Sequence, residues 1–151
     1  MGFFSNLLKA GEDPEPTLTD PVLGEMKWSA DDEGWLGFHN GFKYLISYDR
    51  KASPEESLLA FAREILNDSA WLNSSLAGAK EKHKDELSPK LRAFYTPEID
   101  ELTWELLRFS KLQRGKDRGK HYIIADLKPS RDRSWFTEFI ERTCQGLGFD
   151  G

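Results

Sequence analysis

The alternation of apolar and polar residues predicts β-structure in the first part of the chain. Between residues 22 and 29 every second residue is mostly apolar, which is typical of a strand with one buried face. Trp35–His39 is predicted to be a short second strand, and Phe42–Tyr48 a third strand with an apolar residue at every second position. Asn40-Gly41 between them is a strong signal for a two-residue hairpin turn. This part of the chain therefore predicts an antiparallel meander of three strands.

The apolar spacing then changes to that of helices. Ser53-Pro54 with Glu56 is typical of a helix start, and this helix is predicted to run to about Asn67. Asp68 or Ser69 can begin a second helix, which Ser88-Pro89 ends. The sequence thus predicts a pair of helices after the meander.

Residues 104–112 fit two patterns. The spacing from Ile99 to Phe109 fits a helix that begins at Thr96-Pro97. The same residues could instead form a strand that pairs with residues 122–127 across a turn bounded by two glycines. The second segment is short and rich in isoleucine, so we favour the hairpin.

The C-terminal segment 133–144 predicts a last helix, and Gly146 suits its C-terminal cap. The apolar face of this helix would be formed by Trp135, Phe136, Phe139 and Ile140. Strands and helices do not alternate regularly, which argues against a doubly wound sheet. The predicted fold class is α+β, with an antiparallel sheet of about five strands built from a three-strand meander, a helix pair, a hairpin and a C-terminal helix.

The first residues differ from the rest. Residues 11–21 are acidic and contain three prolines, which exclude a helix interior or a central strand. We expect residues 1–19 to be a short helix with an acidic linker, and residues 20–151 to be a single domain. The short helix could dock on a protein or bind a membrane surface weakly, through Phe3, Phe4, Leu7 and Leu8. No apolar run approaches the roughly 18 residues that span a bilayer, so an integral membrane protein is not expected.

The composition offers little for cofactor or metal chemistry. Cys144 is the single cysteine, which excludes a disulfide within the chain and a thiolate-rich metal site. We expect a cytoplasmic protein. The chain has neither glycine-rich phosphate-binding motif, and its histidines lack zinc-site spacing. No metal or cofactor is predicted.

The histidines give only a dispersed catalytic hypothesis. His39, Asp49 and His121 could assemble an acid–base site if the fold brought them together. Each alone is expected to be a surface or edge residue. We therefore favour a non-enzymatic protein and keep an enzyme with such an assembled site as the alternative.

Charge is unevenly distributed along the chain. Residues 108–133 contain nine basic and three acidic residues, although the net charge of the chain is −5. The pI of about 5.3 argues against a dedicated nucleic-acid binder, since these usually have basic domains. A basic patch that faces an acidic protein partner is the better hypothesis. Its candidate residues are Lys111, Arg114, Lys116, Arg118, Lys120, Arg131 and Arg133.

Aromatic residues crowd the meander. If they point outward, Trp28, Trp35 and Phe38 are candidate interface anchors, because aromatic side chains dominate binding hot spots. If they point inward, they form the core face of the sheet.

One short motif carries a resemblance. Asp20-Pro-Val-Leu-Gly-Glu25, followed by Trp35 to Gly37, resembles the opening of small uncharacterised bacterial domains that begin with an Asp-Pro-Val-x-Gly-Glu strand. The resemblance covers residues 20–127 and implies a bacterial protein without assigned chemistry. Some small domains of this kind are suspected immunity or toxin-associated proteins. The resemblance therefore implies an interaction protein, with the immunity type as one form of this hypothesis.

Overall fold

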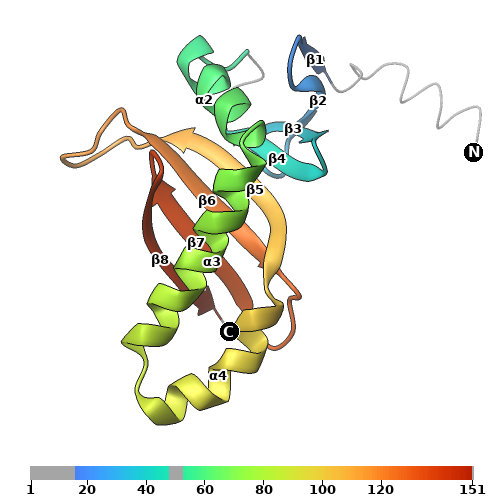
Figure 1. The fold of residues 1–151 in the computed structure, drawn as a ribbon. Helices are drawn as coiled ribbons and strands as arrows, with labels where there is room; N and C mark the ends of the chain where they lie inside the picture. The colour runs from blue at the N-terminus through green and yellow to red at the C-terminus, as the bar shows by residue number, and fades with distance from the viewer. Residues whose placement is uncertain (1–15, 48–52, 151) are drawn as a thin grey trace, which may run out of the picture.

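Eight strands form one sheet in the computed structural model, which describes residues 16–47 and 53–150. Their spatial order follows the chain (Figure 1). Neighbours are antiparallel, except that β4 and β5 are parallel. The strands are β1 (Thr17–Asp20), β2 (Gly24–Ser29), β3 (Gly34–His39), β4 (Phe42–Ser47), β5 (Thr103–Lys111), β6 (His121–Lys128), β7 (Ser134–Ile140) and β8 (Thr143–Asp150).

Three helices connect the two parallel strands. They are α2 (Glu56–Leu66), α3 (Ser69–Glu86) and α4 (Pro89–Glu101). A parallel pair needs such a crossover, since a tight turn can join only antiparallel strands. In Figure 1 the long helix α3 runs across the sheet, and α4 lies near the C-terminal end of β8.

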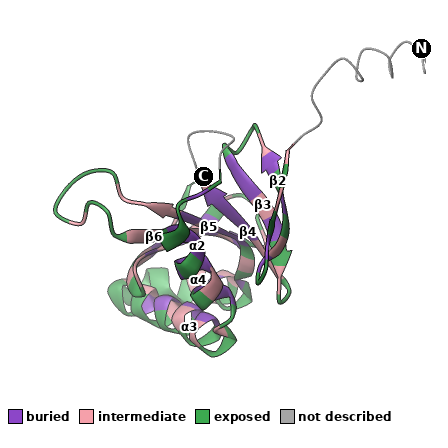
Figure 2. Cartoon of the chain, turned by 90° about the horizontal axis from the view of Figure 1, so that it is seen from above, coloured by how far each residue is buried: buried purple, intermediate pink, exposed green. Residues whose placement is uncertain are grey.

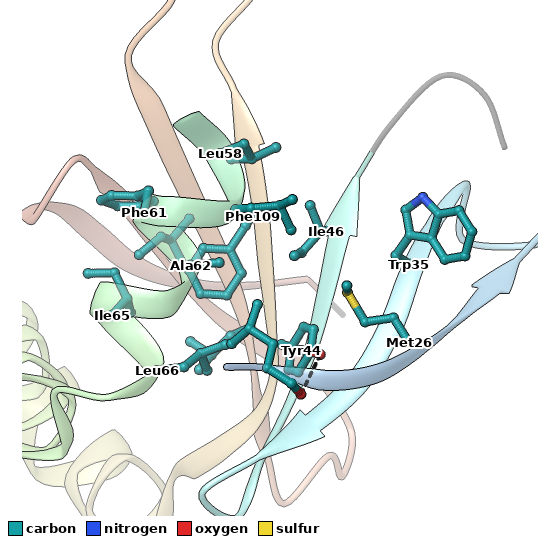
Figure 3. Packing of buried hydrophobic residues seen from close by; sticks show 14 of the residues in the cluster. Met26, Trp35, Tyr44, Ile46, Leu58, Phe61, Ala62, Ile65, Leu66 and Phe109 are labelled. Carbon is teal, nitrogen blue, oxygen red and sulfur yellow. Dashed lines mark hydrogen bonds between the residues drawn. The ribbon is translucent and has the colours of Figure 1, made fainter. Parts of the chain in front are cut away.

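The main core lies between α2 and the central strands (Figure 3). Phe61, Ile65 and Leu66 of α2 are buried against Phe109 and other side chains of the sheet. Figure 2 shows buried residues concentrated along the central strands. The meander aromatics Trp28 and Trp35 belong to this core, at 7% and 3% exposure, and they pack edge to face with ring centroids 5.6 Å apart.

The prediction of about five antiparallel strands is wrong, because the sheet has eight strands and is mixed. The predicted C-terminal helix over residues 133–144 is instead a hairpin made by β7 and β8. Trp135, Thr137 and Phe139 are buried while the residues between them are only half-buried, so the real period is two. Apolar residues lie on both faces of β7, which produced a false helical spacing. Aromatic and β-branched residues of this kind suit strands.

Two further differences follow from the pairing of the strands. The segment Thr17–Asp20, within the expected linker, forms β1 at the edge of the sheet, where nearby prolines are tolerated. Gly146 does not cap a helix. It lies beside the register shift between Glu138 and Phe139, with a φ of 149° that favours glycine. Residues 104–112 are mostly strand, as β5, so the hairpin alternative holds there.

Candidate functional site

The face of β5–β7 that carries no helix contains an open groove. Leu107, Ile123 and Phe139 point into the core under the helices. Because side chains alternate along strands, Arg108, Ile124 and the alternate residues of β7 point to the opposite side. The groove has a volume of about 840 Å³. It is lined by Glu105, Arg108, Ile124, Asp126, Leu127, Lys128, Ser130, Ser134, Trp135, Phe136, Glu138 and Asp150.

Ion pairs across the strands hold the cations of this groove. Arg108 donates to Asp126 Oδ2 from Nη2 at 2.7 Å and from Nε at 3.2 Å. Lys128 Nζ lies 4.0 Å from Glu105 Oε2. Both pairs lie at the surface, so each adds less than about 1 kcal/mol to stability.

The remaining two carboxylates of the groove, Glu138 and Asp150, have no ion pair with any described residue. Burial raises the pKa of the Tyr122 hydroxyl to about 12, and the negative charge of Glu138 adds to the shift. Tyr122 therefore stays neutral at physiological pH and can donate to Glu138. The groove has a surplus of negative charge on the β7–β8 side.

A second hollow of about 250 Å³ adjoins the groove and shares Glu105 and Lys128 with it. Phe38 of β3 lies at this hollow with 68% of its surface exposed. Of the three interface candidates from the sequence, Phe38 alone is exposed, since Trp28 and Trp35 are buried. The two hollows together extend across the sheet from β8 to the β3–β4 hairpin.

The turn between β5 and β6, residues 112–120, projects from the body of the protein (Figure 2). We call it the cationic loop. Backbone hydrogen bonds close it, from Leu112 to Lys120 at 3.0 Å and from Gly119 to Leu112 at 2.8 Å. Gly115 and Gly119 have φ values of 82° and 87°, which only glycine adopts without strain. The loop thus has a defined backbone conformation.

The structure divides the seven basic candidates into two places. Five lie on or beside the cationic loop. Lys111 Nζ pairs with Glu55 at 2.5 Å and Lys120 Nζ with Asp117 at 3.0 Å. The other three, Arg114, Lys116 and Arg118, are exposed and form no ion pair with a described residue.

The remaining two arginines lie after β6, at the opposite end of the hairpin. Arg131 pairs with Glu101. Arg133 Nε lies 2.6 Å from Glu98 Oε2, and its guanidinium lies over the Tyr95 ring at 4.9 Å. Glu98 thereby keeps a pKa below its usual range, since hydrogen bonds from Arg133 stabilise its charge. These arginines are engaged with the protein itself.

The catalytic candidates do not form a common constellation in the described part. His39 Nε2 lies 2.7 Å from Asn67 Oδ1 at the end of α2. His121 Nδ1 lies 3.1 Å from Glu141 Oε2, and its ring stacks on Phe61 at 4.5 Å. Asp49 lies outside the described residues. The two histidines thus have separate partners.

No group of three or more histidine, cysteine or carboxylate side chains suited to a metal ion occurs in residues 16–47 and 53–150. Among the helices of these residues, none is long and apolar enough to cross a membrane. The apolar side chains expected to touch a membrane, Phe3, Phe4, Leu7 and Leu8, lie outside the described residues.

The groove residues on β7 were not predicted, because residues 133–144 were expected to form a helix, and Asp150 on β8 lies beyond that segment. The alternation Trp135, Thr137, Phe139 was the signal that would have found them. Comparison of the chain with protein-family models, with curated proteins and with solved structures gives no match.

Proposed function

We propose that the chain is a non-enzymatic protein-interaction domain that binds an acidic partner through the cationic loop. The observation that supports this is a set of three exposed cations, Arg114, Lys116 and Arg118, that have no ion pair within residues 16–47 and 53–150. In the immunity-type form of the proposal, the chain is cytoplasmic and the partner is a toxin.

The neighbourhood of the loop favours an electrostatic role. Asp117 is the one acidic residue in it and is already paired with Lys120. A projecting group of like charges gains most from a partner of opposite sign, which speeds association and aligns the two surfaces. Such charges at the rim of an interface act chiefly on the association rate and its salt dependence.

Affinity capture from the native host tests the proposal. The bait is the full chain, compared with the variant Arg114→Glu, Lys116→Glu, Arg118→Glu. Its matched control is Lys27→Glu, Lys82→Glu, Lys90→Glu, which changes the net charge equally at three exposed lysines that pair with no acidic residue in the described part of the chain. We expect the wild type and the control to retain one acidic protein, and the loop variant to bind it at least ten-fold more weakly.

Two results would contradict the proposal. One is a partner that the loop variant retains as well as the wild type does. The other is the absence of any specific partner across several salt concentrations. A DNA duplex that binds the wild type tightly, and the loop variant weakly, would replace the protein partner by nucleic acid phosphates.

A further inference from the structure

The groove on the helix-free face is a second candidate site, separate from the cationic loop. Its charges do not balance. Its lining contains four carboxylates and two cations, and each cation is already paired inside the groove. Glu138 on β7 and Asp150 on β8 are the two carboxylates left without a cation among the described residues. A cation supplied from outside would meet both attraction and hydrogen-bond acceptors here.

The floor between these charges is apolar. Ile124 on β6 lies opposite Glu138 of β7 and opposite Arg108 of β5. Phe136 pairs with Gly148 of β8, and its ring lies 3.5 Å from the place where a Cβ on that glycine would stand. The ring therefore covers β8 where that strand has no side chain. Leu127 and Trp135 contribute less, because their side chains belong to the core on the other side.

An apolar floor with carboxylates at its rim matches the side chains of arginine and lysine. Both carry an aliphatic stem and a charged head, and they commonly bury the stem while the head meets polar groups. A guanidinium can also lie over an aromatic face such as that of Phe136.

The length of the hollow points to a polypeptide as the occupant. The groove continues into the smaller hollow beside Phe38, which is a solvent-exposed apolar side chain on the same side of the sheet. Sites for small molecules are lined mostly by apolar side chains, whereas this groove has six charged ones. Many partly hydrated charges suit a segment of another protein better.

We infer that the groove binds an extended segment of a second protein in which a basic residue is flanked by apolar residues. The stem of the basic residue packs on Ile124 and Phe136, and its head pairs with Glu138, which lies opposite Ile124. Asp150 lies opposite Ser134, farther along β7, and attracts the head at longer range. An apolar residue farther along the same segment contacts Phe38 on β3. The occupant is chemically opposite to the acidic partner of the cationic loop, so the two sites do not compete.

Titration of the ¹⁵N-labelled full chain with acetyl-Ser-Leu-Arg-Leu-Ser-amide tests this inference by NMR. We expect shift changes at the amides of Ile124, Phe136 and Glu138. Replacement of arginine in the peptide by glutamine should weaken binding at least ten-fold, because the neutral head cannot compensate the two carboxylates.

Paired variants of the protein give the matched comparison. Glu138→Gln with Asp150→Asn should weaken the arginine peptide at least ten-fold. Asp31→Asn with Glu64→Gln neutralises two exposed carboxylates elsewhere and should leave binding unchanged. Urea unfolding checks that both variants are folded. The cationic-loop variant should bind the peptide like the wild type, which separates this site from the proposed function.

Several results would overturn the inference. One is a glutamine peptide that binds as tightly as the arginine peptide. The others are amide shift changes confined to residues outside the groove, and no amide shift change at about 5 mM arginine peptide. Ethylguanidinium that binds as strongly as the peptide would show a small-molecule site instead.

Discussion

Asp20 is the most strongly constrained charged residue that the structure describes. It is 5% exposed, and its carboxylate accepts hydrogen bonds from the backbone of Val22 and Leu23, each at 2.9 Å. The Arg63 guanidinium of α2 donates to both of its oxygens. These bonds, that of Arg63 first, lower the pKa of Asp20 to about 2. The edge of the sheet is thereby fixed to α2.

The depressed pKa of Asp20 predicts acid sensitivity. The unfolded carboxyl titrates near 3.8, so the charge of Asp20 stabilises the fold above that pH, and this stability is lost as pH falls towards 2. The contribution is about 2 kcal/mol. Asp20→Asn should therefore lower the free energy of unfolding at pH 7 by about 2 kcal/mol.

Urea titrations from pH 7 to pH 2, followed by tryptophan fluorescence, measure this effect. The curves of wild type and variant should converge at low pH. Asp31→Asn, in an exposed turn, is the control. A constant difference between wild type and Asp20→Asn across the pH range would contradict the assignment.

Gly37 shows how close the packing is on β3. A Cβ on Gly37 would lie 2.4 Å from Tyr44 Oη and 2.6 Å from Tyr44 Cζ. Tyr44 is fully buried and its hydroxyl donates to the Leu23 carbonyl oxygen at 3.2 Å. The ring therefore has nowhere to move without the loss of this bond.

We expect Gly37→Ala to destabilise the protein by about 2 to 3 kcal/mol, because the methyl group overpacks the core. Gly78→Ala is the matched control, since a Cβ there meets nothing within 4 Å on helix α3. That change should stabilise by up to about 1 kcal/mol, as alanine favours helix. Thermal unfolding of both variants measures the contrast, and equal effects would refute the packing argument.

Among the elements, α4 is the least buried helix that the structure describes. Ile99 is its one buried residue. Leu91 and Phe94 are 45% and 64% exposed. The helix is held by Ile99, by the Tyr95 ring, which packs against Trp135 and Phe149, and by end contacts such as the Ser88 side chain that caps its first turn.

This arrangement predicts unequal effects along α4. Ile99→Ala should cost about 3 kcal/mol, because it opens a cavity under the helix. Phe94→Ser should change the free energy of unfolding by less than about 0.5 kcal/mol. Urea unfolding of the two variants provides the comparison. A large loss of stability in Phe94→Ser would show that its ring is packed.

The strands also show how much of the fold could be predicted from the sequence. The strands of the meander lie close to their predicted positions, because the first and third segments alternate and Asn40-Gly41 marks the turn between the second and the third. The β5–β6 hairpin was recognisable from its glycines. The hairpin of β7 and β8 was not, because Phe136 and Ile140 add apolar residues to the second face of β7.

The two candidate sites also differ in how far they could be predicted from the sequence. The cationic loop is contiguous in sequence, so its charges were visible, but only the structure separates paired from unpaired cations. The groove draws residues from β5, β6, β7 and β8, and it exists only where these strands are side by side. No local pattern contains that information. The parallel pairing of β4 with β5 is non-local in the same way.

At the scale of the whole molecule, the sheet consists of two antiparallel ladders. β1–β4 form one and β5–β8 the other, and three residue pairs of β4 and β5 join them. The first ladder carries Phe38, the second carries the cationic loop and most of the groove. The relative position of the two proposed binding surfaces therefore depends on the parallel pairing of β4 with β5, which we call the seam.

The seam also has a consequence for the order in which the chain assembles. Every other strand pair that the structure describes is joined by a short connection and can form early. The β4–β5 pair can form only when the long connection that contains all three helices is closed. This closure costs conformational entropy. In stopped-flow experiments, Ile46→Val at the seam should slow folding, whereas Leu147→Ala in β8 should chiefly accelerate unfolding. The reverse pattern would place the rate-limiting step in the second ladder.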